Sequence, residues 1–189
     1  MTTMDRILAI AFVSALTLGI SRADDPPASK LLFDFADAAA MGGWAVEDDV
    51  IMGGRSKSTL VRDPAGHIVF SGNVSLENGG GFASIQNHFA PIDVSKYTHV
   101  VIRLKGDGKK FCYLVEAEKN APNYYVAEFP TNGEWQEIKI PLRKMYPVRR
   151  GDRLDIPNFP GKTMTQSRFM IANGRAEAFR LEVASIRLE

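Results

Sequence analysis

The stretch THVVIRLKGDGKKFCYL, residues 98–114, decides the fold class. In its first half, apolar residues recur at every second position, the period of a half-buried β-strand: Val100, Ile102 and Leu104. Gly106 and Gly108 then flank Asp107, and a second strand-like run follows. Two such runs around a glycine-bearing reversal are typical of a β-hairpin, so we predict one over Arg103–Leu114.

The same alternation recurs in five further runs: GHIVFSGNVSL, NYYVAEF, EWQEIKIPL, SRFMIAN and AFRLEVASIRLE. Gly72 interrupts the first run and predicts a bulge or bend, and a one-residue slip predicts a bulge near Ala184 in the last. Only Phe35–Met41 has a locally helical pattern. About ten short strands with glycine-bearing turns predict an all-β fold, an antiparallel β-sandwich or jelly roll.

The N-terminal residues have the pattern of a secretory signal. Residues 1–23, MTTMDRILAIAFVSALTLGISRA, combine a short polar start, an apolar run and small residues around Arg22, which predicts cleavage after Ala23. The alternatives are a mitochondrial transit peptide, which is usually Arg-rich and amphipathic, and an uncleaved anchor. We therefore expect a signal peptide at 1–23, a polar linker at 24–30 and one domain at 31–189, exported to the periplasm or beyond.

Composition excludes several classes of protein. The chain of 189 residues has a formal net charge of +1, so nothing global draws it to nucleic acid or to an anionic membrane. We expect no transmembrane span in the mature chain. Cys112 is the only cysteine, which rules out an internal disulfide. Its strand-like surroundings predict a small buried hydrophobe rather than a catalytic thiol.

Two glycine-rich stretches, EDDVIMGGRS (47–56) and NGGGFASI (78–85), raise the question of a phosphate-binding loop. Neither opens a helical pattern, and the G-x-G-x-x-G spacing is missing, so nucleotide binding through them is disfavoured. The chain has no G-x-S-x-G motif. We predict no cofactor and no catalytic residue.

Metal-binding motifs are also missing from the sequence. The three histidines lie far apart: His67, His88 and His99. Asp48 and Asp49 would join a calcium site only if their segment were a loop, since adjacent strand residues point to opposite faces.

Five ordered blocks carry a family resemblance: WAVEDDVIMGGRSKS, FSGNVSLENGGGFASI, LKGDGKKFCY, GEWQEIKIPL and FRLEVASI. Together they resemble the complex I intermediate-associated protein 30 family, the NADH:ubiquinone oxidoreductase assembly-factor domain. The resemblance implies a galactose-binding-like jelly roll, akin to non-catalytic carbohydrate-binding modules. It also implies an assembly role without enzyme activity, although an export signal would separate this chain from complex I assembly.

The positions that match the family motifs are expected to serve the fold. The glycines would permit positive φ or close backbone contact at the sandwich edge, and both tryptophans would lie in the core rather than form a platform. This structural set comprises Trp44, Met52, Gly53, Gly54, Ser56, Gly80, Gly81, Phe82, Gly106, Asp107, Gly108 and Trp135.

Six residues are candidates for contact with a ligand or partner: Asp49, Asn78, Tyr124, Tyr146, Arg149 and Arg150. Asp49 and Asn78 either satisfy backbone groups of the turns or face a ligand. Tyr124 and Tyr125 point to opposite faces, so one of them leaves the core. The irregular segment Arg143–Gln166 is long enough to be functional, and it carries the other three candidates.

The leading hypothesis is a non-enzymatic, exported binding domain that contacts a protein partner or assists assembly. The alternative is a carbohydrate-binding module that recognises a glycan through a loop end or a sheet face. A hydrolase or a nucleotide-dependent reductase is the third hypothesis.

Overall fold

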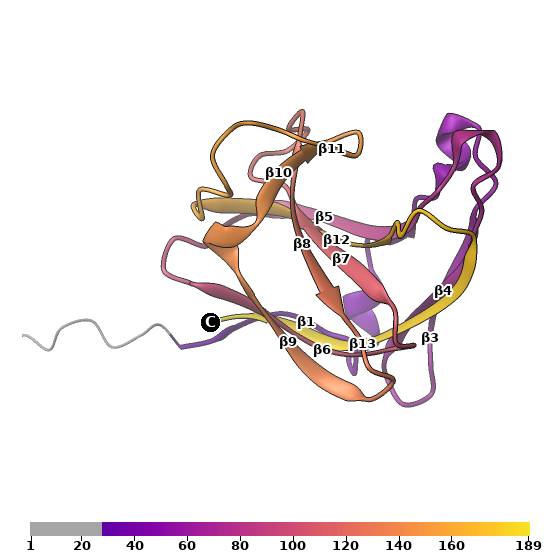
Figure 1. Ribbon diagram of the computed structural model, residues 1–189. Coiled ribbons are helices and arrows are strands. Elements are labelled where there is room, and N and C mark those ends of the chain that lie inside the picture. The colour runs from indigo at the N-terminus through magenta and orange to yellow at the C-terminus, as the bar shows by residue number, and fades with distance from the viewer. Residues whose placement is uncertain (1–27) are drawn as a thin grey trace, which may run out of the picture.

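The computed structural model describes residues 28–189, which form two antiparallel β-sheets (Figure 1). The first sheet has the strand order β3-β4-β13-β6-β9, with β1 paired to β13, and is called sheet A below. The second, sheet B, has the order β11-β10-β8-β7-β12-β5-β2. The predicted all-β sandwich is confirmed. The predicted signal peptide and residues 24–27 of the linker lie outside the described residues.

Sheet A comprises β1 (Lys30–Asp34), β3 (Lys57–Arg62), β4 (Ile68–Val74), β6 (His99–Gly106), β9 (Trp135–Pro141) and β13 (Glu177–Leu188). Sheet B comprises β2 (Trp44–Val46), β5 (Ala83–Asp93), β7 (Lys110–Val115), β8 (Tyr124–Pro130), β10 (Tyr146–Arg149), β11 (Asp152–Arg153) and β12 (Thr163–Ile171). Four 3-10 turns connect strands: η1 (Ala38–Met41), η2 (Asp49–Met52), η3 (Glu77–Gly79) and η4 (Leu142–Lys144). Within the described residues, none of these helical turns has the length and apolar character needed to cross a membrane.

The core lies between the sheets and is built from the inward half of each alternating strand. Its largest fully buried side chains include Phe35, Phe70, Phe111, Tyr113 and Phe169. Burying one such ring contributes about 1.5–3 kcal/mol relative to exposure, so alternation alone selects which face of each strand turns inward. The hydroxyls of Tyr113 and Ser167 pair at 2.6 Å, which satisfies both polar groups inside the core.

The predicted hairpin over Arg103–Leu114 is wrong. Strand β6 pairs with β13 and β9 in sheet A, whereas β7 pairs with β8 and β12 in sheet B. The Gly-Asp-Gly turn therefore carries the chain from one sheet to the other. A Cβ on Gly106 would overlap the side chain of Thr131, and the Gly108 N–H donates to the Thr131 hydroxyl at 3.1 Å. Alternation cannot distinguish two paired strands from two strands in facing sheets, because the same apolar side chains are buried in the core in both arrangements.

The two bulge predictions have opposite outcomes. The ladders of β4 with β3 and β13 run through Gly72 without a register shift, so no bulge occurs there. A Cβ on Gly72 would instead collide with the backbone at Lys57 and Ser58, so this glycine allows close approach of β3. The bulge at Ala184 is confirmed by a register shift between Val183 and Ser185.

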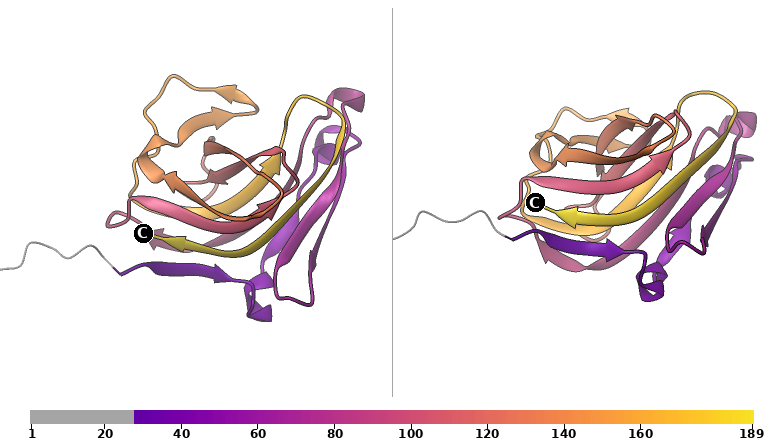
Figure 2. Two further views of the ribbon diagram at one scale, coloured as in Figure 1. Left: turned by 60° about the horizontal axis from the view of Figure 1, so that its bottom comes forward. Right: turned by 90° about the horizontal axis from the view of Figure 1, so that it is seen from below.

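The segment Arg143–Gln166, predicted to be irregular, contains secondary structure of its own. Strands β10 and β11 form a hairpin whose turn places Arg150 at φ +52° and Gly151 at φ +91°. This β10–β11 hairpin extends sheet B at its edge beyond β8 (Figure 2, left). The locally helical pattern over Phe35–Met41 corresponds to η1.

Candidate functional site: a groove on the outer face of sheet B

The three acids of the EDD motif act in three different places. Glu47 faces the outer side of sheet B, where its carboxylate lies 3.1 Å from the Arg168 guanidinium. Asp48 accepts from the backbone N–H and the hydroxyl of Ser58 at 2.8 and 2.7 Å. Asp49 turns inward and links two loops. The motif is therefore a junction between segments rather than a cluster of free carboxylates.

Asp49 is fully buried and accepts four hydrogen bonds. The N–H and hydroxyl of Ser56 donate at 2.9 and 2.6 Å, and the N–H groups of Gly81 and Phe82 donate at 2.7 and 3.2 Å. Burial opposes ionisation, but these donors outweigh it and hold the pKa of Asp49 below its usual value. Both oxygens are occupied by donors that a cation would have to displace, so the calcium hypothesis for Asp48 and Asp49 finds no support.

The paired glycines make room for this carboxylate. A Cβ on Gly54 would overlap the Asp49 side chain, and a Cβ on Gly80 would lie 2.6 Å from its Oδ2. Gly53 ends η2 at φ +93°, a region that L side chains rarely adopt. The two glycine-rich stretches thus meet around one buried acid, which fixes the shape of the surface above them.

That surface is one wall of a groove of about 430 Å³. The floor is the outer face of β12 and its neighbours, and the two walls rise on opposite sides of it (Figure 1). One wall is the β10–β11 hairpin, through Val148, Arg150 and Gly151. The other consists of η2 and the loop after η3, through Ile51, Met52 and residues 79–82.

Register pairing places side chains in rows across the outer face of sheet B, in the groove floor and next to it. Leu114, Arg168 and Gln86 are opposite one another on β7, β12 and β5. Gln166 and His88 are paired in the next row along β12 and β5. Glu116 extends that row, because its carbonyl accepts from the Thr165 N–H beside Gln166. The row Glu116–Gln166–His88 is called the polar row below.

Arg168 lies at the centre of the floor and is only 5% exposed. Besides its ion pair with Glu47, it donates to the Ser84 hydroxyl at 2.8 Å and to Gln86 Oε1 at 3.3 Å. Its guanidinium lies 5.4 Å from the ring of Tyr124 and 6.0 Å from that of Phe82. The Nε of Arg168 has no hydrogen-bond partner among the described residues.

The polar row also carries unsatisfied atoms. Glu116 is 3% exposed and Gln166 is fully buried, yet Glu116 Oε2 and Gln166 Oε1 lack a donor within the described part of the chain. His88 Nδ1 lies 3.9 Å from Glu116 Oε2, too far for a hydrogen bond. Burial raises the pKa of Glu116. Buried polar atoms are rarely left unpaired. Such atoms also occur on Trp44, Asn123 and Gln136, so it is their position beside the groove that makes those on this face of sheet B candidates for function.

The structure brings only some of the predicted candidates to this groove. Tyr124 and Arg150 line it. Tyr146 is half-buried against Cys112, Leu114 and Val126, with the Arg153 guanidinium 4.8 Å from its ring. The other three lie elsewhere: Asp49 is inside the loop junction, Asn78 is exposed in η3 at φ +56°, and Arg149 is exposed at the end of β10.

Sequence reasoning missed Glu47 and Arg168 in the groove, and it missed the polar side chains next to the groove on the same face of sheet B: Gln86, His88, Glu116 and Gln166. The only signal was alternation, since Gln166, Arg168 and Met170 occupy every second position of the run that also contains SRFMIAN. Polar residues at such positions are typical of any solvated sheet face. Alternation does not reveal that Gln166 and Arg168 are buried.

Two predicted interior residues have different positions on the sandwich. Trp44 is 8% exposed and packs on Phe169, with ring centroids 6.0 Å apart. Trp135 is half-exposed on the outer face of sheet A instead of in the core. It contacts the His67 ring at 4.5 Å between centroids. Cys112 is buried as predicted, and burial raises the pKa of its thiol to about 12, which keeps it protonated and unreactive.

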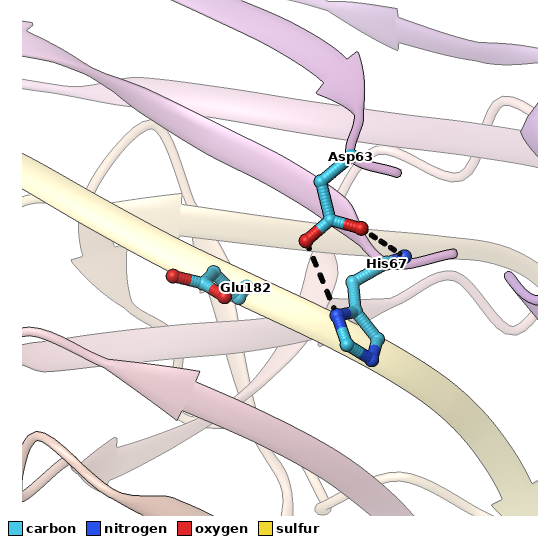
Figure 3. Close-up of side chains that lie close together, drawn as sticks. All are labelled: Asp63, His67 and Glu182. Carbon is cyan, nitrogen blue, oxygen red and sulfur yellow. Dashed lines mark hydrogen bonds and ion pairs between the residues drawn. The ribbon is translucent and has the colours of Figure 1, made fainter. Parts of the chain in front are cut away.

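Sheet A carries one cluster with metal-ligand chemistry, which the histidine spacing did not predict. Asp63, His67 and Glu182 approach within 4.8 Å of one another (Figure 3). Asp63 accepts from the His67 N–H at 2.8 Å and lies 3.2 Å from its Nδ1. Arg180 pairs with Glu182 at 2.9 Å. All three side chains already have partners inside the protein, so we place the candidate site in the groove of sheet B.

This architecture is an all-β sandwich of two antiparallel sheets, a fold that carbohydrate-binding modules also have. The chain is similar to a family 11 carbohydrate-binding module from Clostridium thermocellum in complex with a β-1,3-1,4-mixed-linked tetrasaccharide, with a TM-score of 0.62, 16% identity, and 85% of this chain and 94% of that chain covered. The chain is also similar to the family 11 module of the cellulosomal cellulase Lic26A-Cel5E of that organism, with a TM-score of 0.61 and 18% identity. This match covers 85% of this chain and 94% of that chain. At these identities the similarity shows the fold alone.

The sequence model of complex I intermediate-associated protein 30 (CIA30) matches residues 33–183. The chain therefore belongs to the CIA30 family. A search of curated protein sequences finds no match.

Proposed function

We propose that the chain is a non-enzymatic binding domain whose groove takes a hydroxyl-rich ligand, a glycan. The observation that carries this proposal is the buried Arg168, which lines the groove and retains an Nε without a partner among the described residues. Next to the groove, on the same face of sheet B, Glu116 and Gln166 each retain an unpaired oxygen as well. An unpaired buried polar atom costs about 1–3 kcal/mol, which a ligand hydroxyl would offset because it both donates and accepts.

The groove also offers apolar and aromatic surface. Tyr124 and Phe82 lie on the two sides of Arg168, and Leu114 and Met170 cover the floor beside it. Sugar rings have C–H faces that pack on aromatic rings, while their hydroxyl edges need planar polar partners. The fold match to a module bound to a tetrasaccharide supports this proposal.

Native gels that contain soluble neutral polysaccharides test the proposal, followed by calorimetry with the matching oligosaccharide. We expect retardation of the wild type and a loss of about tenfold in affinity for Tyr124→Ala, equal to about 1.4 kcal/mol of stacking. Val61→Ala is the control, because Val61 is 53% exposed on sheet A, far from the groove lining. No retardation by any polysaccharide would refute the glycan proposal.

A protein partner is the second candidate, favoured by one apolar patch. Val50, Ile51, Met52 and Leu76 are 58%, 72%, 64% and 47% exposed in η2 and just before η3, and Ile51 and Met52 also line the groove. Large apolar side chains gathered on adjacent loops often mark a protein-binding surface. The description of the CIA30 family as complex I intermediate-associated also favours a protein partner.

A photo-crosslinker in place of Ile51, compared with one in place of Val61, tests the second candidate. We expect one protein to be captured at position 51 alone, and its capture to be lost when Met52→Asp is added. Equal yields of the same crosslinked proteins at positions 51 and 61 would refute the protein-partner candidate.

Export is proposed from the signal-like residues 1–23 and would place the domain where extracellular glycans occur. N-terminal sequencing of the mature protein tests it, with Asp24 expected as the first residue.

A further inference from the structure

We infer that Arg150, at the turn of the β10–β11 hairpin, makes the groove prefer glycans that carry carboxylates, the uronic-acid class, over their neutral counterparts. This inference rests on the proposed glycan function and specifies the substrate class of the same groove. Its basis is the charge of the groove lining and the backbone conformation that holds Arg150 there.

The groove lining carries an excess of positive charge on the hairpin wall. Three of the described residues that line the groove are charged: Glu47, Arg150 and Arg168. The Arg168 guanidinium lies 3.1 Å from the Glu47 carboxylate, so these two charges compensate each other. Arg150 forms no ion pair within residues 28–189. The hairpin sequence RRGDR, residues 149–153, adds further arginines and a single acid, so the wall as a whole is cationic.

The backbone of the turn is unfavourable for an arginine. Arg150 and Gly151 are the two residues between the last paired positions of β10 and β11, and both have positive φ, +52° and +91°. Such hairpin turns favour asparagine or glycine at the first of these positions. In the described part of the chain, the other non-glycine residues with positive φ are both asparagines, Asn78 and Asn120. A strained residue that lines a groove is a candidate for function.

The chemistry of a guanidinium selects a carboxylate. It has N–H donors in a planar fork and no acceptor, and the two oxygens of a carboxylate match that fork. A sugar hydroxyl accepts one hydrogen bond but leaves the charge of Arg150 uncompensated. Tyr124 pairs in register with Val148, two residues before Arg150, and all three line the groove. A glycan that packs on Tyr124 therefore passes close to Arg150.

Glu116 is the acid that opposes this preference, but it acts from beneath the surface. It is 3% exposed, its Oε2 has no solvent contact, and it does not line the groove. Burial raises the pKa of its carboxyl, and the charged side chains that also act on it are His88, Arg168 and Glu47. A ligand in the groove thus meets the exposed Arg150 directly and Glu116 only indirectly.

The test compares neutral polysaccharides with the same polymers oxidised at C6, where a CH2OH group becomes a carboxylate and the backbone is unchanged. Mixed-linkage glucan, xyloglucan, galactomannan and their oxidised forms are titrated against the wild type, Arg150→Asn and the control Arg149→Gln. Arg149 is the exposed neighbour at the end of β10 and does not line the groove. We expect the wild type to bind an oxidised polymer about fivefold more tightly than its neutral parent, as one exposed charged pair allows.

Arg150→Asn is expected to reduce that ratio to about one or below and to keep the affinity for the neutral polymer, because asparagine suits the turn and lacks the charge. Arg149→Gln should keep a ratio of about threefold or more at physiological salt, which screens charges that do not touch the ligand. A wild type that binds both polymer forms equally or prefers the neutral form overturns the inference and leaves the glycan function standing. A ratio that persists in Arg150→Asn, or that falls as far in Arg149→Gln, does the same. A wild type that binds none of these polymers overturns both.

Discussion

Two carboxylates, Asp49 at the loop junction and Glu116 in the polar row, are almost equally buried but have opposite surroundings. Asp49 accepts four hydrogen bonds and has a lowered pKa. Glu116 retains an oxygen without a donor and has a raised pKa. Ionised Asp49 therefore stabilises the folded chain, whereas ionised Glu116 destabilises it.

The contrast separates the two roles of buried charge in this protein. Asp49 joins the stretches 47–56 and 78–85 and is satisfied by the protein alone. Glu116 has an unfilled hydrogen-bonding capacity next to the groove-lining Tyr124, a local cost that proteins retain chiefly at functional sites. Substitution of Asp49 should therefore destabilise the fold, whereas substitution of Glu116 should affect function.

The largest effect is expected for Asp49→Asn. The amide has the same shape, but its NH2 group would face N–H and O–H donors and leave them unpaired. We expect a loss of about 3 kcal/mol in the free energy of unfolding, measured by urea denaturation. Asp152→Asn, at an exposed position on β11, should change it by less than about 0.5 kcal/mol. Equal urea midpoints for the two variants would contradict the role of Asp49.

Gly54→Ala tests the same junction from the other side. The Cβ of an alanine at position 54 would overlap the Asp49 carboxylate, which must then move away from its donors. We therefore expect the free energy of unfolding to fall by about 2 kcal/mol. Gly174→Ala is the matched control, because Gly174 has φ +69° and open space around it. Backbone strain alone should lower the free energy of unfolding of Gly174→Ala by about 1 kcal/mol. A loss in Gly54→Ala no larger than that in Gly174→Ala would show that overlap with Asp49 is not what requires a glycine at position 54.

The same contrast shows what the sequence could predict. Alternation identified the strands and the slip at Ala184, because burial of apolar side chains depends on a period of two. It did not reveal that β6 and β7 belong to different sheets, since both arrangements bury the same residues. The role of Asp49 was among the alternatives, because turns around glycines leave N–H groups unpaired.

The floor of the groove was beyond prediction for a different reason. Arg168 and Gln166 look like solvated positions of a central strand. Both are buried: Arg168 lies against the rings of Phe82 and Tyr124, and Gln166 contacts Gln86 and His88, all of them distant in sequence. Burial of this kind depends on tertiary contacts between segments that local patterns cannot connect.

Glu116→Gln is expected to change stability less than Asp49→Asn does, and in the opposite direction. Removing a buried charge that lacks a partner should raise the free energy of unfolding at pH 7 by about 1 kcal/mol. Calorimetric melting checks this, and the same preparation should bind a neutral glycan more weakly. A variant that is both less stable and unchanged in binding would show that Glu116 serves the fold, as Asp49 does.

The smallest expected effect is the pH dependence of stability, which the two acids should change in opposite ways. Stability from Asp49 is present above its ordinary pKa of 3.8 and is lost as the pH falls through its lowered value. Glu116 favours the folded state fully below its ordinary pKa of 4.5, and this stability is lost as the pH rises through its raised value. Asp63 and Glu137 also have lowered pKa values, so the informative quantity is the variant minus the wild type. Unfolding free energies from pH 3 to 8 should give a difference that falls with rising pH for Asp49→Asn and rises for Glu116→Gln. Parallel curves for the two variants would mean that the two buried acids do not differ as their hydrogen bonds indicate.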